Sequence, residues 1–304
     1  MLHLGLDIGG TKMEAVMLNA DGECVYRQRR PTHKESYEAF MLQLLGLIDS
    51  VRQWSEQPFT IGIGLPGAID PQSGLIKNCN CLVLNGHDLR RDLKQQLGQP
   101  VWIANDADCF TLSEAVDGAG AGASTVFGVI IGTGCGGGIA VNQQLLSGPN
   151  AIVGEWGHNT LPGYTPERDG PDQPCYCGKV NCIESFISGT GFARRFGEQA
   201  QAEAIIQAAG DGDPQAQAHW QHFIDAFARS LASVINILDP QVIVLGGGLS
   251  NVEKIYGALP AALVPYLFSD SCRTQIKPAR FGDASGVRGA AWLPVLANSA
   301  DRWR

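Results

Sequence analysis

The sequence lacks the features that would place the protein on nucleic acid or in a membrane. The formal net charge of the 304 residues is -8, and no run of Lys and Arg is longer than a doublet. Nothing in such a chain could neutralise a phosphate backbone. No apolar run approaches the roughly 20 residues that cross a bilayer, and no basic segment precedes the first apolar stretch, as it would in a signal peptide. We therefore expect a cytoplasmic protein that binds neither nucleic acid nor membrane.

A disulfide framework is also not expected. The chain has nine cysteines, an odd number, without a signal peptide. Reduced thiols, some of them on a metal, are the better interpretation. Glycine is what the sequence has in abundance: 38 glycines, many of them clustered, indicate turns in which the backbone takes positive φ or lies against a ligand.

Apolar runs predict an α/β protein built from two similar halves. Residues 2–8 and 13–18 are typical of two strands joined by a glycine turn, and residues 126–131 and 138–141 repeat that pattern. The chain is long enough for two lobes around a cleft. We expect these lobes to comprise residues 1–115 and 116–304, with the last helix returning to the N-terminal lobe.

The remaining elements follow from periodicity and from breakers. The sequence predicts helices over 35–54, 89–97 and 223–238, strands over 60–65, 101–104 and 242–245, and an exposed loop over 163–174. Ser250 or Asn251 is expected to cap the helix that follows the last of these strands.

Three glycine turns each follow an apolar strand, which is how a fold brings backbone N–H groups to the phosphates of a nucleotide. A single turn would indicate only a hairpin, so the prediction rests on all three. Asp7, just before the first turn, is costly to bury without a cation, and we expect it to hold Mg²⁺ through water. The letters GxGxxG occur at 132–137 but lead into a strand, which excludes a dinucleotide fingerprint. The predicted ATP-binding residues are Asp7, Gly9, Gly10, Thr11, Lys12, Gly132, Thr133, Gly134, Gly246, Gly247 and Gly248.

A cluster of cysteines has the composition of a structural zinc site. Three thiols within eight residues and an upstream histidine supply four ligands, which would close a tetrahedral Zn²⁺ site and leave no open position for catalysis. Such a site would hold Glu155 and Glu184 in place to accept hydrogen bonds from a polyol. The alternative is unrelated surface cysteines beside a core histidine. The predicted metal ligands are His158, Cys175, Cys177 and Cys182.

Taken in order, these motifs resemble the ROK sugar kinases over residues 4 to about 292. The resemblance rests on Asp7-x-Gly-Gly-Thr-Lys12, Asn105-Asp106, Glu155-x-x-His158 and the segment Cys175–Glu184. It implies an actin-like, ribonuclease-H-like pair of lobes with a structural zinc loop, ATP held at the glycine turns, and a homodimer. Residues 129–138, 175–192 and 286–292 are most similar to bacterial fructokinases.

The resemblance also implies roles for single residues. Asp106 matches the base that takes the proton of the sugar hydroxyl during in-line phosphoryl transfer. His158 would use one ring nitrogen for the metal and the other for the sugar. The implied substrate-binding residues are Asn80, Asn105, Asp106, Glu155, His158 and Glu184. The substrate expected first is D-fructose, and also mannose, phosphorylated at O6; N-acetyl-D-glucosamine and glucose are the alternatives within the family.

Two positions depart from the family pattern. Asp108 stands where the family has Asn, and we expect its side chain to face away from Asp106, since two inward carboxylates would repel each other. Asn181 replaces a Gly and should keep the left-handed turn that the metal ligands need.

Functions of other classes fit the sequence less well. A ROK-type repressor would need a DNA-binding domain ahead of the first strand, which here begins at about residue 2. A non-catalytic sugar sensor would not need Asp7, Lys12 and Asp106 together. A zinc-ribbon interaction module would need a second pair of ligands and a basic face.

Overall fold

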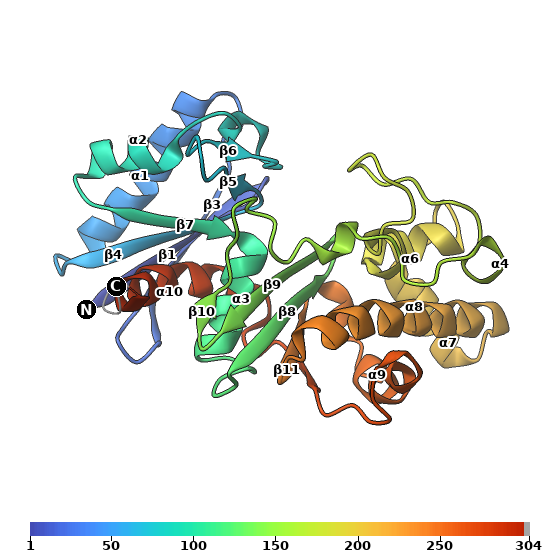
Figure 1. Ribbon diagram of the computed structural model, residues 1–304. Coiled ribbons are helices and arrows are strands. Elements are labelled where there is room, and N and C mark those ends of the chain that lie inside the picture. Colours follow the sequence, from blue (N-terminus) through green and yellow to red (C-terminus); the bar gives the residue numbers. More distant parts are fainter. Residues whose placement is uncertain (301–304) are drawn as a thin grey trace.

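Two five-stranded mixed sheets form the framework of the protein (Figure 1), which a computed structural model describes for residues 1–300. The first sheet has the order β3-β2-β1-β4-β7 and the second the order β10-β9-β8-β11-β12. In each sheet the first three strands of the lobe are antiparallel, and two later strands are added in parallel. The repeated topology confirms the prediction of a duplicated α/β unit.

Seven of the ten strands in these two sheets lie where the apolar runs predict them, and the strands at 24–31, 144–145 and 275–278 were not predicted. The strands of the first sheet are β1 (Leu2–Ile8), β2 (Lys12–Leu18), β3 (Cys24–Pro31), β4 (Phe59–Leu65) and β7 (Val101–Asn105). Those of the second are β8 (Thr125–Ile131), β9 (Cys135–Val141), β10 (Gln144–Leu145), β11 (Val242–Gly246) and β12 (Gln275–Pro278). A small hairpin of β5 (Ala68–Ile69) and β6 (Ile76–Lys77) extends the first lobe towards the cleft.

Helix α1 (Tyr37–Trp54) covers the first sheet together with α2 (Leu89–Leu97). Ser36 caps α1 by accepting a hydrogen bond from the Ala39 N–H, so the helix begins two residues later than predicted. Its predicted apolar stripe is buried: Phe40, Leu44, Leu47, Ile48 and Val51 all have no exposed surface. These side chains join one core cluster with the strands of the first sheet.

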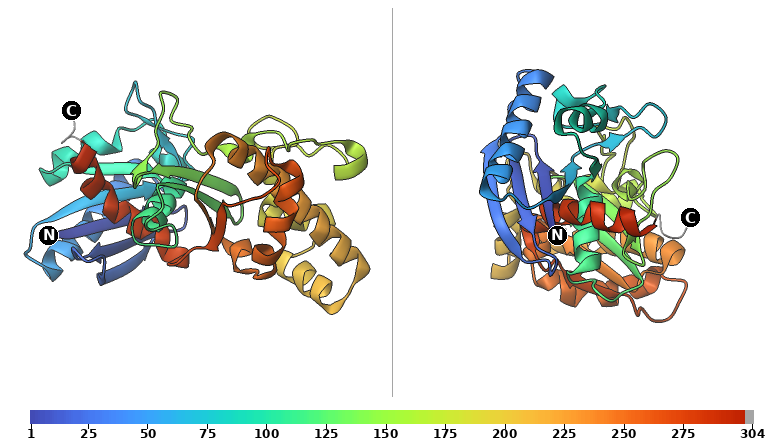
Figure 2. Two further views of the ribbon diagram at one scale, coloured as in Figure 1. Left: turned by 60° about the horizontal axis from the view of Figure 1, so that its bottom comes forward. Right: turned by 90° about the vertical axis from the view of Figure 1, so that its left-hand side faces the viewer.

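Helices α3 (Asp106–Val116) and α10 (Ser285–Ala300) lie between the two sheets and pack closely on each other. Glycines permit the close approach of α10 to the first sheet: a Cβ on Gly5 would lie 2.0 Å from the Val287 carbonyl oxygen, and one on Gly62 would lie 1.8 Å from that of Ala290. Helix α10 therefore sits against β1 and β4 of the N-terminal lobe, far from its neighbours in sequence, as Figures 1 and 2 show.

The helices of the second lobe form the largest core cluster, against one face of the second sheet. They are α5 (Glu184–Ile187), α6 (Gly189–Phe196), α7 (Ala202–Asp211), α8 (Pro214–Leu238) and α9 (Lys254–Leu263). Helix α8 begins at Pro214, because Asp213 caps it through the Ala216 N–H, and is therefore longer than its predicted apolar stripe.

Two sequence expectations in this lobe are wrong. Ser250 and Asn251 do not cap α9; they end a 3₁₀ turn, Gly248–Asn251, and the Ser250 hydroxyl donates back to the Gly247 carbonyl oxygen at 2.7 Å. The segment 163–174 is also not simply an exposed loop. It contains the short helix α4 (Pro166–Asp169), and Asp169 is only 6% exposed, because an arginine of α8 pairs with it.

No helix within residues 1–300 has the length and apolar character needed to cross a membrane.

Candidate active site

A cleft of about 370 Å³ opens where the two lobes meet. Its walls come from turns and helix ends distant in the sequence, and six of the residues predicted for ATP or sugar line it: Asp7, Gly9, Gly10, Asn80, Asp106 and Gly247. Three residues that the sequence did not indicate, Gly282, Asp283 and Gly286, lie in its wall just before and within the start of α10. The structure thus brings the first glycine turn, the third glycine turn and the proposed base to one cavity.

The second and third glycine turns touch each other across the end of the second sheet. Gly247 has a φ of +83°, and a Cβ there would lie 2.8 Å from the Gly132 nitrogen. Gly132 in turn accepts a hydrogen bond from the Gly189 N–H at 2.7 Å, which fixes the turn to the start of α6. No side chain could enter this contact, so the backbone of both turns stays close to the cleft.

The other residues predicted for ATP do not line the cleft. Thr11, Lys12 and Thr133 are exposed. Gly246 faces Phe110, whose ring atoms would lie 2.5 Å from an added Cβ, and Gly134 faces the Glu184 carboxylate.

Asp7 and Asp106 both line the cleft, and the charge of Asp106 acts on Asp7. Asp7 is the penultimate residue of β1 and pairs with Gly64 of β4. Burial raises its pKa to about 6, and the nearby charges of Asp106 and Glu14 act in the same direction. A carboxylate held in this way is stabilised by a cation, so the oxygens present fit a hard ion such as Mg²⁺.

Asp106 is the first residue of α3, placed there by its neighbour. Asn105 caps the helix: its Oδ1 accepts from the Ala107 N–H at 2.8 Å, and its Nδ2 donates to the Gly67 carbonyl oxygen at 3.1 Å. Asp106 Oδ1 accepts from the same N–H at 2.8 Å. Burial raises the pKa of Asp106 to about 6, partly offset by these backbone hydrogen bonds, and the charge of Glu155 raises it further. A carboxylate with this pKa suits a general base near neutral pH.

Asp108 does not face away from this group as expected. Its Oδ1 is buried and has no hydrogen-bond partner. Burial raises the pKa of Asp108 to about 7, and the charges of Asp106 and Glu155 raise it further. The charges of Asp106, two residues earlier on α3, and of Glu155, from a distant segment, therefore both act on the Asp108 carboxylate.

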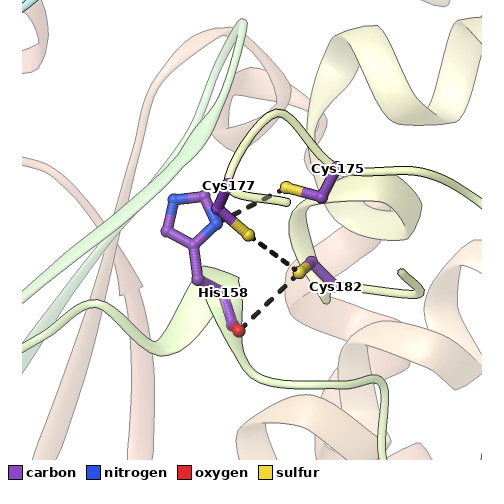
Figure 3. A group of neighbouring side chains, drawn as sticks. All are labelled: His158, Cys175, Cys177 and Cys182. Atoms are coloured by element: carbon purple, nitrogen blue, oxygen red, sulfur yellow. Dashed lines mark hydrogen bonds between the residues drawn. The ribbon is translucent and has the colours of Figure 1, made fainter. Parts of the chain in front are cut away.

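The four predicted metal ligands come together (Figure 3). Their ligand atoms all lie within 4.8 Å of one another. His158 Nδ1 lies 3.6 Å from Cys175 Sγ, and Cys177 Sγ lies 3.6 Å from Cys182 Sγ. Zn–S bonds of about 2.3 Å in a tetrahedron would separate two sulfurs by about 3.8 Å. The donor set and its spacing therefore fit a structural Zn²⁺ ion.

The turn that carries these ligands depends on Asn181 and Gly178. Asn181 has a φ of +60° and Gly178 a φ of +88°, so the left-handed conformation expected of Asn181 is present. The Asn181 side chain is buried and accepts from the Gln173 N–H at 2.7 Å. Its amide donates to Asp172 at 2.8 Å.

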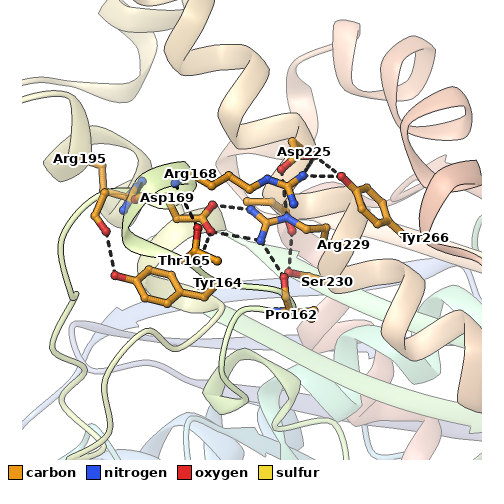
Figure 4. A network of polar contacts seen from close by, with 12 residues as sticks. Pro162, Tyr164, Thr165, Arg168, Asp169, Arg195, Asp225, Arg229, Ser230 and Tyr266 are labelled. Atoms are coloured by element: carbon orange, nitrogen blue, oxygen red, sulfur yellow. Dashed lines mark hydrogen bonds and ion pairs between the residues drawn. The ribbon is translucent and has the colours of Figure 1, made fainter.

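A buried polar network holds the segment between His158 and Cys175 against α8 (Figure 4). Arg229 and Asp169 form an ion pair in which the two side chains are 3% and 7% exposed. Arg229 also donates to the Pro162 carbonyl oxygen at 2.7 Å and to Asp225 at 3.0 Å. Arg168 donates to Asp225 at 2.7 Å. A buried pair with every group bonded is costly to break, so the metal-binding segment has a fixed base.

The two glutamates beside the metal cluster lie at different depths. Glu184 Oε2 accepts from the Cys135 N–H at 2.8 Å, which ties α5 to the second glycine turn. Glu155 is exposed at the start of the short turn Trp156–His158, with its charge acting on Asp106.

The remaining ring nitrogen of the metal-cluster histidine has a partner that the sequence did not indicate. His158 Nε2 lies 3.0 Å from the Tyr176 hydroxyl. Desolvation of this hydroxyl, followed by the charges of Glu184 and Glu155, raises the pKa of Tyr176 to about 12. The charges of both glutamates thus act on the Tyr176 hydroxyl.

The comparisons with known proteins agree with this geometry. A model of the ROK family matches residues 3–295. N-acetyl-D-glucosamine kinases from Yersinia enterocolitica and Pasteurella multocida are 40% and 39% identical over 299 and 300 residues, covering 96% of this chain and 99% of each relative. These relatives favour the N-acetyl-D-glucosamine alternative over the fructokinase that the sequence motifs put first.

Solved structures of the same family share the fold. A ROK hexokinase from Thermus thermophilus matches with a TM-score of 0.86 and 29% identity, covering 99% of this chain and 100% of that one. A ROK family glucokinase from Streptomyces griseus, in complex with glucose and AMPPNP, matches with a TM-score of 0.75 and 25% identity, covering 96% and 98%. The family match over nearly the whole length and the identity to its members show that this chain belongs to the ROK family.

Proposed function

We propose that the protein is an ATP-dependent sugar kinase whose substrate is N-acetyl-D-glucosamine. The substrate class is supported by relatives at about 40% identity that carry this name and align over their full lengths. D-fructose, with mannose, is the second candidate, because residues 175–192 and 286–292 resemble the fructokinases of the same family.

The observation that carries the proposal is the position of Asp106. Its carboxylate lies in one cleft with Gly9 and Gly10 from one lobe and Gly247 from the other. Backbone turns of this kind bind phosphates, and a carboxylate opposite them is placed to orient a hydroxyl for in-line attack and to accept its proton. The raised pKa of Asp106, about 6, matches that role at neutral pH.

The other site residues have supporting roles in the proposal. Asn80, Asn105, Glu155, His158 and Glu184 bind sugar hydroxyls, and the three glycine turns bind the nucleotide. Asp7, with Asp283 nearby in the cleft wall, holds Mg²⁺ through water; the bound ion would neutralise charge on the transferring phosphates. A Zn²⁺ ion on His158 and the three cysteines would fix the segment that carries the glutamates.

Two broader expectations from the sequence remain proposals. We take residues 1–115 and 116–304 as the two lobes, with α10 docked on the first. A homodimer is expected from the family resemblance.

A panel of sugars tests the substrate. Purified protein is assayed with ATP and Mg²⁺ against N-acetyl-D-glucosamine, D-fructose, D-mannose and D-glucose, and kcat/KM is compared. We expect N-acetyl-D-glucosamine to give the highest value. A higher value for D-fructose would move the assignment to the second candidate, and phosphorylation of none of them would contradict the proposed function.

A further inference from the structure

Tyr176 is placed on the metal-binding turn so that its side chain meets His158 from outside. It lies between two of the cysteines, and it is 83% exposed. The two rings meet edge to face, with centroids 5.1 Å apart and an interplanar angle of 89°. The tyrosine hydroxyl lies 3.0 Å from His158 Nε2. Through this contact with His158, the Tyr176 hydroxyl touches the proposed sugar site.

His158 can serve only one oxygen partner through that nitrogen. Its Nδ1 faces the sulfurs, and Figure 3 shows the second ring nitrogen on the far side of the ring. With Nδ1 used as a ligand, the neutral imidazole carries its single proton on Nε2 and donates one hydrogen bond. With a metal on Nδ1, the Tyr176 oxygen, 3.0 Å from Nε2, would accept that bond. A sugar hydroxyl on the same atom must therefore replace it.

We propose that Tyr176 is a specificity-determining residue of the sugar site, whose hydroxyl occupies His158 Nε2 in the sugar-free protein and is displaced by one hydroxyl of the substrate. This inference rests on the proposed function, since it takes His158 as a sugar ligand. A sugar that lacks the matching hydroxyl cannot take over the bond. Such a sugar forms no hydrogen bond with His158, and the Tyr176 hydroxyl keeps its place on Nε2.

The surroundings allow such an exchange. The ring is exposed, so it can rotate away without opening a cavity, while the ligand turn and the Asp169–Arg229 pair hold the backbone. In the proposed function, Glu155 and Glu184 remain to accept hydrogen bonds from the incoming sugar. One hydrogen bond between neutral groups contributes a factor of about 2 to 10 in an equilibrium constant, which sets the expected size of the effect.

Substitution of the tyrosine tests the exchange by binding alone. Dissociation constants of the preferred sugar are measured by calorimetry, without nucleotide, for the parent protein and for Tyr176→Phe. The variant lacks the competing oxygen and should bind the sugar about 2 to 10 times more tightly. Tyr164→Phe is the matched control: Tyr164 lies in the same segment, but its hydroxyl bonds to Gly170 and Asp172. It should bind the sugar as the parent does.

Deoxy analogues of the sugar sharpen the test. The gain from Tyr176→Phe should disappear for the one analogue that lacks the displacing hydroxyl and persist for the others. Unchanged or weaker binding by Tyr176→Phe would overturn the inference, and so would an equal gain for every analogue. If the parent phosphorylates the sugar while Tyr176→Phe binds it no more tightly, the inference fails and the proposed function stands. A parent that neither binds nor phosphorylates any of the sugars contradicts both.

Discussion

The two lobes repeat one topology but contribute different chemistry to the cleft. Asp7 is the penultimate residue of β1, and its counterpart at the end of β8 is Ile130; both line the same cavity. The first lobe also supplies Asp106, whereas the part of the chain after residue 116 supplies Asp283 and Gly247, the latter in contact with the turn at Gly132. The two lobes thus share one framework, while the proposed base and the acid before the first glycine turn both come from the first lobe.

The largest effect should come from the acid of the first lobe. Asp106→Asn keeps the size of the side chain but removes the base, so kcat should fall by about 10²- to 10⁴-fold while sugar affinity changes little. Steady-state kinetics and calorimetry measure the two quantities. Asp49→Asn, an exposed acid of α1, is the control and should keep full activity. An Asp106→Asn enzyme as fast as the parent would show that the base is another group.

The metal-binding turn of the second lobe should affect the sugar and not the nucleotide. Cys177→Ser removes one ligand, and we expect loss of bound zinc and a sugar affinity weaker by about 10- to 100-fold. Nucleotide affinity should stay within twofold or so, because Gly247 and Gly132 lie outside the cluster. Cys272→Ser, a half-buried thiol elsewhere, should keep its zinc. A parent protein that is fully active without bound metal would contradict the proposal of a structural zinc ion.

The glycines of the second lobe should act on the nucleotide. Gly247→Ala forces a left-handed alanine and a contact 2.8 Å from the Gly132 nitrogen. Strain of about 1 to 3 kcal/mol at this turn should weaken nucleotide binding by about 10-fold or more. Gly122→Ala is the matched control, since Gly122 has a φ of +84° but open space around it. It should lower stability without changing nucleotide affinity; equal effects of both variants on nucleotide binding would contradict the assignment.

The smallest effect should be a shift in the pH profile. Asp106 must be unprotonated to accept a proton, so activity should be present above its pKa of about 6 and be lost as the pH falls through it. The charge of Asp106 raises the pKa of Asp108, and two carboxyl groups that interact in this way titrate as a pair. Asp108→Asn should therefore move the acid limb of kcat to lower pH, by up to about one unit. A limb that stays in place or moves upward would show that Asp108 does not act on the base.

The sequence predicts features that depend on neighbouring residues better than features that depend on contacts between distant segments. Seven strands, the glycine turns and the clustering of the cysteines at 175–182 depend on neighbours in sequence, and periodicity and spacing indicate them correctly. The return of the last helix to the first lobe was expected, but no spacing within the segment shows that the return brings Gly282, Asp283 and Gly286 into the cleft wall.

The burial of particular polar side chains could not be predicted from the sequence either. Asp169 lies in a polar, proline-containing stretch and is buried only because Arg229, 60 residues later, meets it. The environment of Asp108 depends on the charge of Glu155, which comes from a distant segment. The contact between the Tyr176 hydroxyl and His158 is likewise visible only in the folded chain. Contacts between distant segments decide each case, and a single sequence does not reveal them.

The most direct test of the account is a crystal structure with the sugar and a non-hydrolysable ATP analogue bound together. We predict that one Asp106 carboxylate oxygen lies within about 3 Å of a sugar hydroxyl, with that hydroxyl directed at the terminal phosphate held by the glycine turns. A sugar bound with no hydroxyl within hydrogen-bond reach of Asp106 would contradict it.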